Sequence, residues 1–492
     1  MFILFVYICC VNFCVNVLNI AKNFNKVDRF NFLIYLLIIG MRNNRRLFLK
    51  NLGLAAAATA VMPSAFSKEV KKTNFLKRTS LNLGSNDTLI RLALIGAGGM
   101  GVADAKTALS HENVEMIAVC DLYSGRLDDA KSRWGGQVFV TKNYKDILDR
   151  DDVDAVIIGT PDHWHKQISI DALKAGKHVY CEKPMVHSVE EGKDVINAWK
   201  GSGKIFMVGS QGLSSLGNEK AKELLEAGAI GEINYAEGFW ARNSPEGAWQ
   251  YTIPEDASPE TVDWNRYIAN TTKRPFDAMR FFRWRNYQDY GTGMAGDLFV
   301  HLFSSLHFIT NSLGPNKVSA TGGLRYWKDG REVPDVLLGM FDYPKTVQHP
   351  PFNLSLRCNF VDGTSGSTYL KIVGSKGSMD VKWDEVVLKR NANVASDDPF
   401  FAEKAKEGVN SQTDRKQIIA PLETVYTAQE GYKGAHYDHF ANFFNAIRTN
   451  GTVVEDPVFG IRAAAPALLC NDSYNQNKFI NWDPVNMKIV KS

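Results

Sequence analysis

The fold is decided by the stretch Thr88–Asp121, which reads T-L-I-R-L-A-L-I-G-A-G-G-M-G-V-A-D-A-K-T-A-L-S-H-E-N-V-E-M-I-A-V-C-D. Its apolar run Leu89–Ile95 has the length of a buried strand. Gly96, Gly98 and Gly101 follow at once in the spacing G-x-G-x-x-G. In this pattern the first glycine allows a tight turn, the second lets the backbone approach a pyrophosphate, and the third lets helix and strand pack together. The stretch therefore predicts the start of a dinucleotide-binding fold.

The residues after the glycines complete this prediction. Val102–Leu109 has a helical pattern, Val114–Cys120 reads as a second buried strand, and Asp121 stands twenty positions after the last glycine. The helix N-terminus offers free N–H groups to phosphates, and the Asp121 carboxylate can accept hydrogen bonds from both ribose hydroxyls. Because a carboxylate repels a 2′-phosphate, NAD is favoured over NADP, and Arg126 lies near enough to weaken that preference. A Gly-rich turn in another α/β protein is the plainer alternative.

Strand and helix patterns alternate as far as residue 212, which predicts a parallel sheet. Three further apolar runs read as its buried strands: Val153–Ile158, His178–Cys181 and Ile205–Val208. Each runs into a polar loop: Gly159-Thr160-Pro161-Asp162-His163-Trp164-His165, Glu182-Lys183-Pro184 and Gly209-Ser210-Gln211. Ligands of open α/β sheets bind at the carboxyl ends of the strands, so we expect these loops to line one site.

At this point the chain resembles the Gfo/Idh/MocA oxidoreductases, relatives of glucose–fructose oxidoreductase and inositol dehydrogenase. The resemblance rests on the glycine motif, Asp121, Thr160-Pro161 with His163, and Glu182-Lys183-Pro184, and it extends from Leu89 to the C-terminus. It implies that Glu182-Lys183-Pro184 lines the nicotinamide, with Pro184 often in a cis bond and Lys183 facing the substrate. The expected cofactor contacts are Gly96, Gly98, Gly99, Met100, Gly101, Asp121, Thr160, Pro161, His163, Glu182, Lys183 and Gln211.

Other roles are possible for Lys183, His163 and His165. A lysine after a strand is usually a solvated surface charge, but beside a cationic cofactor, like charge and desolvation lower the pKa of an ammonium toward acid–base use. His163 and His165 could ligate a metal, yet no third ligand is near in sequence, so we predict no metal site. We expect cofactor or substrate contact from His163. For Trp164 and His165 we expect either support of the residues that contact the ligand or a structural role.

The second half of the chain, residues 213–492, reads as an α+β domain. A helical pattern spans Asn218–Ala227, and apolar alternation separated by short turns predicts an open, mostly antiparallel sheet. The expected strands are Glu232–Ala241, Lys317–Tyr326, Val336–Tyr343, Leu354–Val361, Ser367–Val373, Ser378–Lys382 and Val386–Lys389. The family resemblance implies the same sheet, which commonly forms a dimer face, so we expect a homo-oligomer.

A predicted helix near Gly296–Thr310 interrupts these strands and carries Asp297 and His301 at i and i+4, on one face. In the family an Asp and a His at this spacing face the substrate across the nicotinamide. The resemblance therefore makes His301 the general acid or base, Asp297 its orienting partner or a substrate contact, and Lys183 the support for a developing alkoxide. The bland alternative is a capping Asp and an unrelated His.

The segment before this helix is dense in aromatic residues. Two explanations fit them equally well. The aromatic residues could pack the core of a long insertion, or they could form a platform on which sugar rings stack, with Arg280, Arg283 and Arg285 binding carboxylates or hydroxyls.

The N-terminus predicts export. Asn44-Arg45-Arg46-Leu47-Phe48-Leu49-Lys50 resembles a twin-arginine motif, and an alanine-rich apolar stretch and Ala65-Phe66-Ser67 follow it. We expect residues 1–40 to be an upstream or leader segment, residues 41–67 a signal peptide directing the protein to the periplasm, and residues 68–88 a linker. Residues 1–67 contain 7 Lys or Arg and 1 Asp, so their removal changes the net charge from +4 to −2. Nothing favours nucleic acid as a partner or a stable membrane span.

The sequence thus predicts a Rossmann dinucleotide-binding domain, residues 89–212, followed by a substrate and oligomerisation domain. The favoured function is an NAD-dependent oxidoreductase, with NADP possible, acting on a sugar, sugar acid or polyol. A glycosidase or lyase that oxidises a sugar transiently is the alternative; the NAD-dependent hydrolase branch of this superfamily lacks the Glu-Lys-Pro signature that this chain has. A non-catalytic sugar-binding protein is a third possibility, against which the complete set of motif residues argues.

Overall fold

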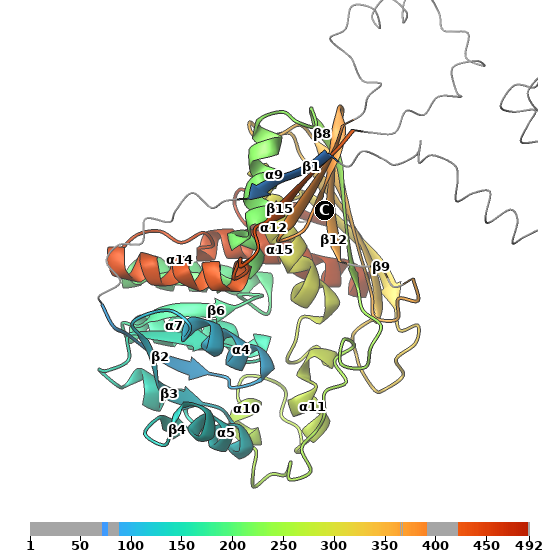
Figure 1. Ribbon diagram of the computed structural model, residues 1–492. Coiled ribbons are helices and arrows are strands. Elements are labelled where there is room, and N and C mark those ends of the chain that lie inside the picture. The colour runs from blue at the N-terminus through green and yellow to red at the C-terminus, as the bar shows by residue number, and fades with distance from the viewer. Residues whose placement is uncertain (1–70, 77–87, 365, 367, 391–421, 491–492) are drawn as a thin grey trace, which may run out of the picture. The chain divides into compact units, whose positions relative to one another are not determined.

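The computed structural model describes residues 71–76, 88–364, 366, 368–390 and 422–490. The expected leader and signal peptide lie outside these described residues. Two sheets and the helices packed on them build the described part of the chain (Figure 1). No helix among the described residues combines the length and apolar character that a bilayer crossing requires.

The first sheet has six strands, all parallel, in the order β4-β3-β2-β5-β6-β7. The strands are β2 (Ile90–Ile95), β3 (Val114–Cys120), β4 (Phe139–Thr141), β5 (Ala155–Ile158), β6 (His178–Glu182) and β7 (Phe206–Gly209). The helices are α4 (Gly99–Ala108), α5 (Ser124–Trp134), α6 (Tyr144–Leu148), α7 (His165–Lys174) and α8 (Gly192–Ser202). This order reverses between β2 and β5, the point where such sheets bind dinucleotides, so the Rossmann prediction is confirmed.

The glycine turn after β2 has the conformation and packing that its spacing predicts. Gly96 has φ +96°, a left-handed conformation, and a Cβ there would lie 2.6 Å from the Gly159 carbonyl carbon. A Cβ on Gly101 would lie 2.0 Å from the Gly96 carbonyl oxygen. No side chain larger than hydrogen fits between α4, β2 and β5 at these points.

The second sheet has eleven strands in the order β1-β15-β14-β13-β12-β8-β11-β10-β9-β16-β17. All neighbouring pairs are antiparallel except β8 with β11 and β1 with β15, so the expected open, mostly antiparallel sheet is confirmed. Its strands are β1 (Lys71–Leu76), β8 (Ile233–Ala241), β9 (Lys317–Gly323), β10 (Val336–Tyr343), β11 (Phe352–Asn359), β12 (Tyr369–Gly374), β13 (Gly377–Val381), β14 (Glu385–Arg390), β15 (Leu422–Ala428), β16 (Ile480–Asp483) and β17 (Lys488–Val490).

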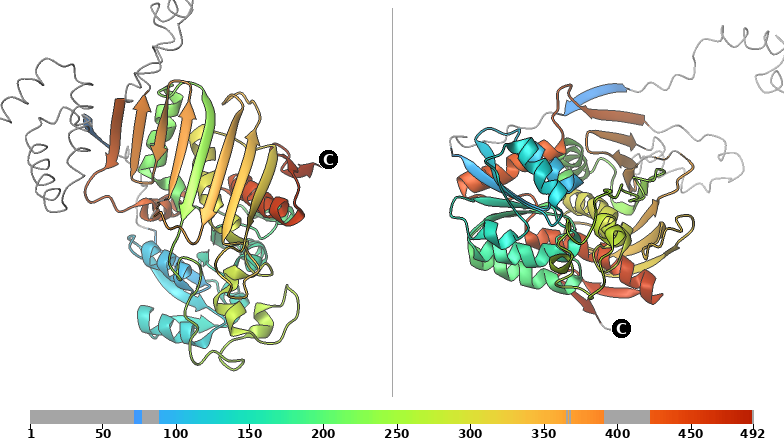
Figure 2. Two further views of the ribbon diagram at one scale, coloured as in Figure 1. Left: turned by 90° about the vertical axis from the view of Figure 1, so that its right-hand side faces the viewer. Right: turned by 90° about the horizontal axis from the view of Figure 1, so that it is seen from below.

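Within the part of the chain that the structure describes, helices cover one face of this sheet and leave the other open (Figure 2). The four long helices among the described residues of this half are α9 (Leu216–Glu226), α12 (Val300–Thr310), α14 (Ala435–Thr449) and α15 (Pro457–Gln476). Alternation along β10, in which Leu337, Phe341 and Tyr343 are buried and Leu338 and Met340 are exposed, matches one covered and one open face. Of the four helices, α14 instead lies against the first domain, where its Phe440 and Phe443 pack on β2 and β6.

Some boundaries differ from the sequence prediction for physical reasons. Residues 71–76, expected within a linker, form the edge strand β1, because their backbone pairs with β15. The strand expected to reach Tyr326 ends at Gly323, since the Asp335 carboxylate accepts the backbone N–H groups of residues 325–327 and turns the chain. The short strands β4, β16 and β17 carry too few residues to show a periodic pattern.

Between β8 and the helix with Asp297, an insertion of residues 242–292 returns to the first domain. It contains the short helices α10 (Trp264–Tyr267) and α11 (Ala278–Phe282), which lie beside α5 in Figure 1. Its aromatic core includes Trp264, Tyr267 and Phe281, and it packs on Tyr123 of the first domain. The insertion is therefore a second connection between the two halves of the chain.

Candidate active site

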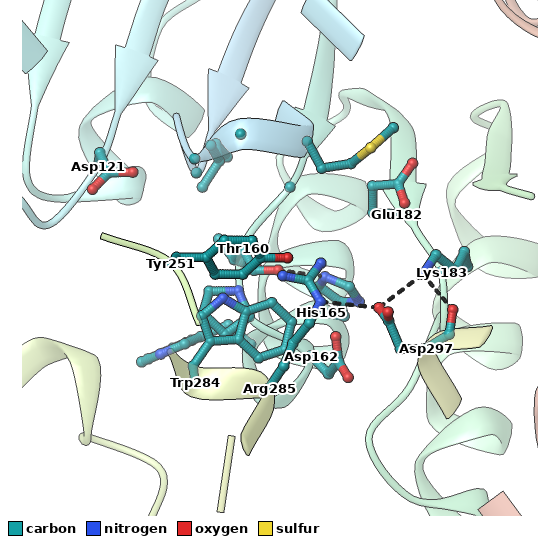
Figure 3. A pocket seen from close by; sticks show the side chains of 18 of the residues that line it. Asp121, Thr160, Asp162, His165, Glu182, Lys183, Tyr251, Trp284, Arg285 and Asp297 are labelled. Atoms are coloured by element: carbon teal, nitrogen blue, oxygen red, sulfur yellow. Dashed lines mark hydrogen bonds and ion pairs between the residues drawn. The ribbon is translucent and has the colours of Figure 1, made fainter. Parts of the chain in front are cut away.

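A cavity of about 730 Å³ opens at the carboxyl ends of β2, β5 and β6, with the second domain and the insertion as its opposite walls. Twelve of the fourteen predicted site residues line it, and Gly101 and His163 do not: the lining set is Gly96, Gly98, Gly99, Met100, Asp121, Thr160, Pro161, Glu182, Lys183, Gln211, Asp297 and His301. Residues separated by about two hundred positions in the sequence thus meet in one space. We call the part near Asp121 the nucleotide end and the part near Lys183 the reacting end (Figure 3).

The glycine turn at the nucleotide end leaves room for a phosphate. A Cβ on Gly99 would meet no atom within 4 Å, and one on Gly98 would meet only the Arg126 guanidinium at 3.9 Å. Helix α4 begins at Gly99, and no side chain caps its first N–H groups. An open cradle below an uncapped helix N-terminus is the arrangement that binds the pyrophosphate of a dinucleotide.

Asp121 is buried beside this turn and holds it in place. Its carboxylate accepts the backbone N–H groups of Ala97 at 2.8 Å and Tyr123 at 3.0 Å, and Arg126 Nη1 lies 3.4 Å from both oxygens. The Arg126 guanidinium in turn lies over the rings of Phe281 and Phe282, 5.8 and 5.5 Å from their centroids. The nucleotide end therefore carries both a carboxylate, Asp121, and a guanidinium, Arg126, in its lining.

The insertion covers the nucleotide end from the other side. Backbone hydrogen bonds join Ser124 to Thr261 (3.0 Å) and Asp263 to Leu122 (2.9 Å), directly after the strand that ends at Asp121. Lys142 Nζ donates to the Thr261 carbonyl at 2.9 Å. Arg266, Tyr267, Phe281 and Phe282 of the insertion then line the cavity opposite the sheet. A dinucleotide in this cavity would be enclosed between sheet and insertion.

The reacting end is built on an ion triad (Figure 3). Lys183, whose peptide bond to Pro184 is cis, donates from Nζ to the Asp297 carbonyl at 2.7 Å and to Asp297 Oδ1 at 2.9 Å. Arg285 Nε donates to the same Oδ1 at 3.0 Å. Burial raises the pKa of Asp297, but the charges of Lys183 and Arg285 outweigh it and hold that pKa well below its usual range. Asp297 is thus a fixed negative charge that places the Lys183 ammonium in the cavity wall.

His301 lies next to this triad. Asp297 belongs to one turn of π-helix, Ala295–Phe299, which continues into α12 and brings His301 into the same cavity. The imidazole stacks on Trp240, with centroids 5.3 Å apart, and meets the edge of Trp383 at 6.1 Å. Burial, and then the charge of Lys183, lower the pKa of His301 well below 6.5, and its buried Nδ1 has no hydrogen-bond partner within the described residues. His301 is therefore a neutral imidazole in the cavity wall.

Comparison with known families agrees with this geometry. Residues 90–210 match the NAD-binding Rossmann fold of the GFO_IDH_MocA oxidoreductase family, and residues 222–482 match the C-terminal α/β domain of the same family. The chain belongs to the Gfo/Idh/MocA family. Its first domain is the family's NAD-binding domain, which fits the open glycine cradle and Asp121.

Individual relatives cover less of the chain. A glycosyl hydrolase family 109 protein of Shewanella pealeana is 28% identical over 46% of this chain and 51% of its own length. An alpha-N-acetylgalactosaminidase of Shewanella oneidensis is 28% identical over 46% of this chain and 50% of its own. The chain thus spans about half the length of the curated relatives it matches.

Solved structures share the fold at low identity. Levoglucosan dehydrogenase in complex with NADH and levoglucosan superposes with a TM-score of 0.58 at 19% identity, over 80% of this chain and 99% of that one. Aldose-aldose oxidoreductase from Caulobacter crescentus, complexed with glycerol, gives 0.57 at 16% identity, over 80% and 99%.

One predicted contact of this Gfo/Idh/MocA chain is wrong. His163 faces away from the cavity, with its ring nitrogens 3.3 and 3.1 Å from the carbonyl oxygens of Tyr290 and Tyr267, and burial lowers its pKa to about 3. Its role is to join the loop after β5 to the insertion. Trp164 and His165, expected to have a supporting or structural role, line the cavity themselves. Neighbouring positions on the short 3-10 turn Asp162–Trp164 point in different directions, which the sequence does not reveal.

His165 also links two loops. Its Nδ1 lies 2.8 Å from the Pro184 carbonyl oxygen and its Nε2 lies 2.9 Å from that of Thr160. Both ring nitrogens thus lie against carbonyl oxygens, and His165 ties the Lys183 loop to the loop after β5.

Of Arg280, Arg283 and Arg285, which the sequence suggested for gripping a substrate, only Arg285 lines the cavity. Arg280 pairs with Glu332 at 2.6 Å, and Arg283 Nε donates to the Tyr251 carbonyl at 2.8 Å. Sequence reasoning missed Arg242, Trp383 and His436, which also line the reacting end. Trp383 lies in the turn between β13 and β14, and no local pattern marks such a position as part of a site. The described residues contain no group of His, Cys, Asp or Glu side chains placed to hold a metal ion.

Proposed function

We propose that this protein is an NAD-dependent oxidoreductase that transfers a hydride between the cofactor and a hydroxyl-bearing carbon of a sugar, sugar acid or polyol. The observation that carries the proposal is the position of Lys183, Asp297 and His301 in the same cavity as the glycine cradle and Asp121. Bound NAD supplies the hydride acceptor. The proton and the developing charge are left to the side chains of the reacting end.

Each of these side chains suits a separate task. The neutral His301, which lines the cavity, can accept the proton of a substrate hydroxyl. The Lys183 ammonium can stabilise the alkoxide that forms as the proton leaves. Asp297 holds Lys183 in place through Oδ1 and its own carbonyl oxygen, so the ammonium needs no reorganisation during the reaction.

The walls of the reacting end suit a sugar ring. Trp240, Tyr251, Trp284 and Trp383 line it, and Arg285 stacks on Trp284 with its guanidinium carbon 4.2 Å from the ring centroid. Aromatic faces pack against the C–H groups of a sugar, while Arg285 and Arg242 can hold its hydroxyl or carboxylate oxygens. These contacts support a carbohydrate substrate without selecting one.

A screen tests the proposal. Neutral sugars, sugar acids and polyols are added singly to the NAD-loaded protein, and the near-ultraviolet absorbance of reduced nicotinamide is followed. One class of carbohydrate should reduce the cofactor, and both Lys183→Ala and His301→Ala should abolish the signal. Full activity in both variants would refute these roles.

A second candidate is a glycosidase or lyase that oxidises its sugar transiently and returns the hydride. Two observations favour it: the curated relatives are named as glycoside hydrolases, and the insertion encloses the nucleotide end, which disfavours exchange of the cofactor in each turnover. The Glu182-Lys183-Pro184 signature favours simple oxidoreduction instead. Cleavage of a glycoside with no net reduced cofactor, seen by product analysis, would decide for this second reading.

We also propose export by the twin-arginine route and assembly into homo-oligomers. Export rests on residues 44–67 of the sequence. Assembly rests on the open face of the eleven-stranded sheet, where Leu338 and Met340 are 43% and 62% exposed. Replacement of Arg45 and Arg46 by lysine should leave the protein in the cytoplasm. Met340→Asp should shift the mass measured by light scattering toward the monomer.

A further inference from the structure

Asp104 is a buried acid that the proposed reaction does not use. It lies on α4, the helix that begins at the phosphate cradle, among Gly101, Ala105 and Ala108 on the buried face. Its side chain is 0% exposed, and neither carboxyl oxygen receives an N–H donor or a hydroxyl within the described residues. A carboxylate buried in this way is strongly destabilised unless it is neutral or paired.

The group that meets Asp104 is a second carboxyl, that of Glu182. Glu182 ends β6 and lines the reacting end immediately before Lys183, as Figure 3 shows. Its Oε1 accepts from Gln211 Nε2 at 2.6 Å, and the same amide donates to the Tyr180 hydroxyl at 3.0 Å. Glu182 therefore has an amide donor that Asp104 lacks. The charge of Lys183 acts on both carboxyls, second after burial for Glu182 but as the smallest of the effects on Asp104.

Two buried carboxyls in contact can form a hydrogen bond only if one of them carries a proton. The charge of Lys183 and the Gln211 amide stabilise the anion on Glu182, so the proton belongs on Asp104. Burial, followed by the charge of Glu182, raises the pKa of Asp104 well above its usual range, which agrees with this assignment.

We propose that Asp104 is a positioning residue that remains protonated, donates its O–H to Glu182, and so fixes Glu182 in the cavity wall beside Lys183. The bond joins the helix that holds the cofactor phosphates to the loop that carries the catalytic lysine. It also keeps a single negative charge, rather than two, next to the site of the nicotinamide. The kinetic part of this inference rests on the proposed function, but the protonation state does not.

Infrared spectroscopy tests the proton directly. A protonated carboxylic acid has a carbonyl stretch that carboxylates lack, and the full-length protein should show such a band at neutral pH. Asp104→Asn should remove one component of it. Glu455 is a second buried carboxyl whose pKa burial raises well above its usual range, so Glu455→Gln serves to assign the second component. A spectrum that Asp104→Asn leaves unchanged would overturn the proposal.

Two substitutions of similar shape test the hydrogen bond. Asp104→Asn keeps a donor toward Glu182, whereas Asp104→Leu removes it. Two quantities are measured for both variants. Quenching of tryptophan fluorescence reports the binding of NAD, and steady-state kinetics report the turnover of the sugar found in the screen. The leucine variant should lose about 10- to 100-fold in turnover, and the asparagine variant should stay within about 3-fold of the wild type.

The outcomes are distinct. Equal damage in both variants, with circular dichroism showing both folded, would contradict a role for the donated hydrogen bond. If the leucine variant does not fold, the infrared band and the near-normal asparagine variant still decide. If no sugar is turned over by the wild type, the proposed function fails, and the infrared band together with NAD binding by the asparagine variant continues to test the Asp104 proton.

Discussion

The two ends of the cavity are built by different means. The nucleotide end is formed by backbone and apolar surface: an open glycine turn, the uncapped start of α4, and the rings of Phe281 and Phe282. The reacting end is formed by buried charges from distant segments, held by hydrogen bonds between Lys183, Arg285 and Asp297. The difference teaches that one end is made to hold a ligand and the other to act on it. Substitutions at the reacting end should therefore change turnover, and those at the nucleotide end cofactor affinity.

The largest effect is expected from Lys183→Ala. Loss of the ammonium removes the group that stabilises the alkoxide, so kcat should fall by about 100- to 10,000-fold while NAD binding changes little. Steady-state kinetics and fluorescence titration measure the two quantities. Lys200→Ala, at an exposed position of α8, is the matched control. An equal loss of NAD affinity would erase the distinction between the two ends.

His301→Ala should cost about 100- to 1,000-fold in kcat, because another group or water must then accept the proton. The pH profile of the wild type sharpens this prediction. Because the pKa of His301 is lowered well below 6.5, the residue stays neutral at pH 6. We therefore expect no decrease of kcat/KM centred at pH 6.5 that is present in the wild type and absent from His301→Ala. Such a loss would mean that His301 is exposed to water in the working enzyme.

A smaller effect is expected from the joint substitution of Phe281 and Phe282 by alanine. Both rings are almost fully buried and cover the nucleotide end with apolar surface. Their removal should speed NAD release by about 10-fold or more and leave kcat within about 3-fold of the wild type. Stopped-flow displacement of NAD measures the rate. Phe479→Ala, at a position 58% exposed, is the control. Unchanged release would show that the insertion does not retain the cofactor.

The smallest effect concerns stability and pH. Burial lowers the pKa of His178 to about 4 and that of His163 to about 3, whereas in the unfolded chain both titrate near 6.5. Below pH 6.5 the unfolded chain therefore binds protons that the folded one does not, and stability falls toward pH 4. The melting temperature should drop between pH 7.5 and 5, and less so in His163→Phe. A melting temperature independent of pH in this window would contradict the burial of these rings.

The same contrast explains what the sequence could predict. The glycine turn, Asp121 and the Glu182-Lys183-Pro184 loop follow directly after strands, so local pattern placed them correctly at the nucleotide end and in the wall beside it. Asp297 and His301 were found from their i, i+4 spacing and the family resemblance. Trp383, Arg242 and His436 could not be found from the sequence. They reach the cavity only because the turn between β13 and β14, the end of β8 and the start of α14 pack together in space. His163 was placed wrongly because the short 3-10 helix Asp162–Trp164 directs neighbouring side chains to different sides, and the sequence does not show which of them faces the cavity.

The central claim is that Lys183 and His301 act on one molecule from either side of the nicotinamide site. The most direct test is a crystal structure of the mature chain with NAD and a sugar that it turns over. The account predicts the dinucleotide running from Asp121 to Glu182, with the reacting hydroxyl within hydrogen-bond distance of both Lys183 Nζ and a nitrogen of His301. A sugar bound beyond the reach of either group, or a nicotinamide lying away from Glu182, would contradict it.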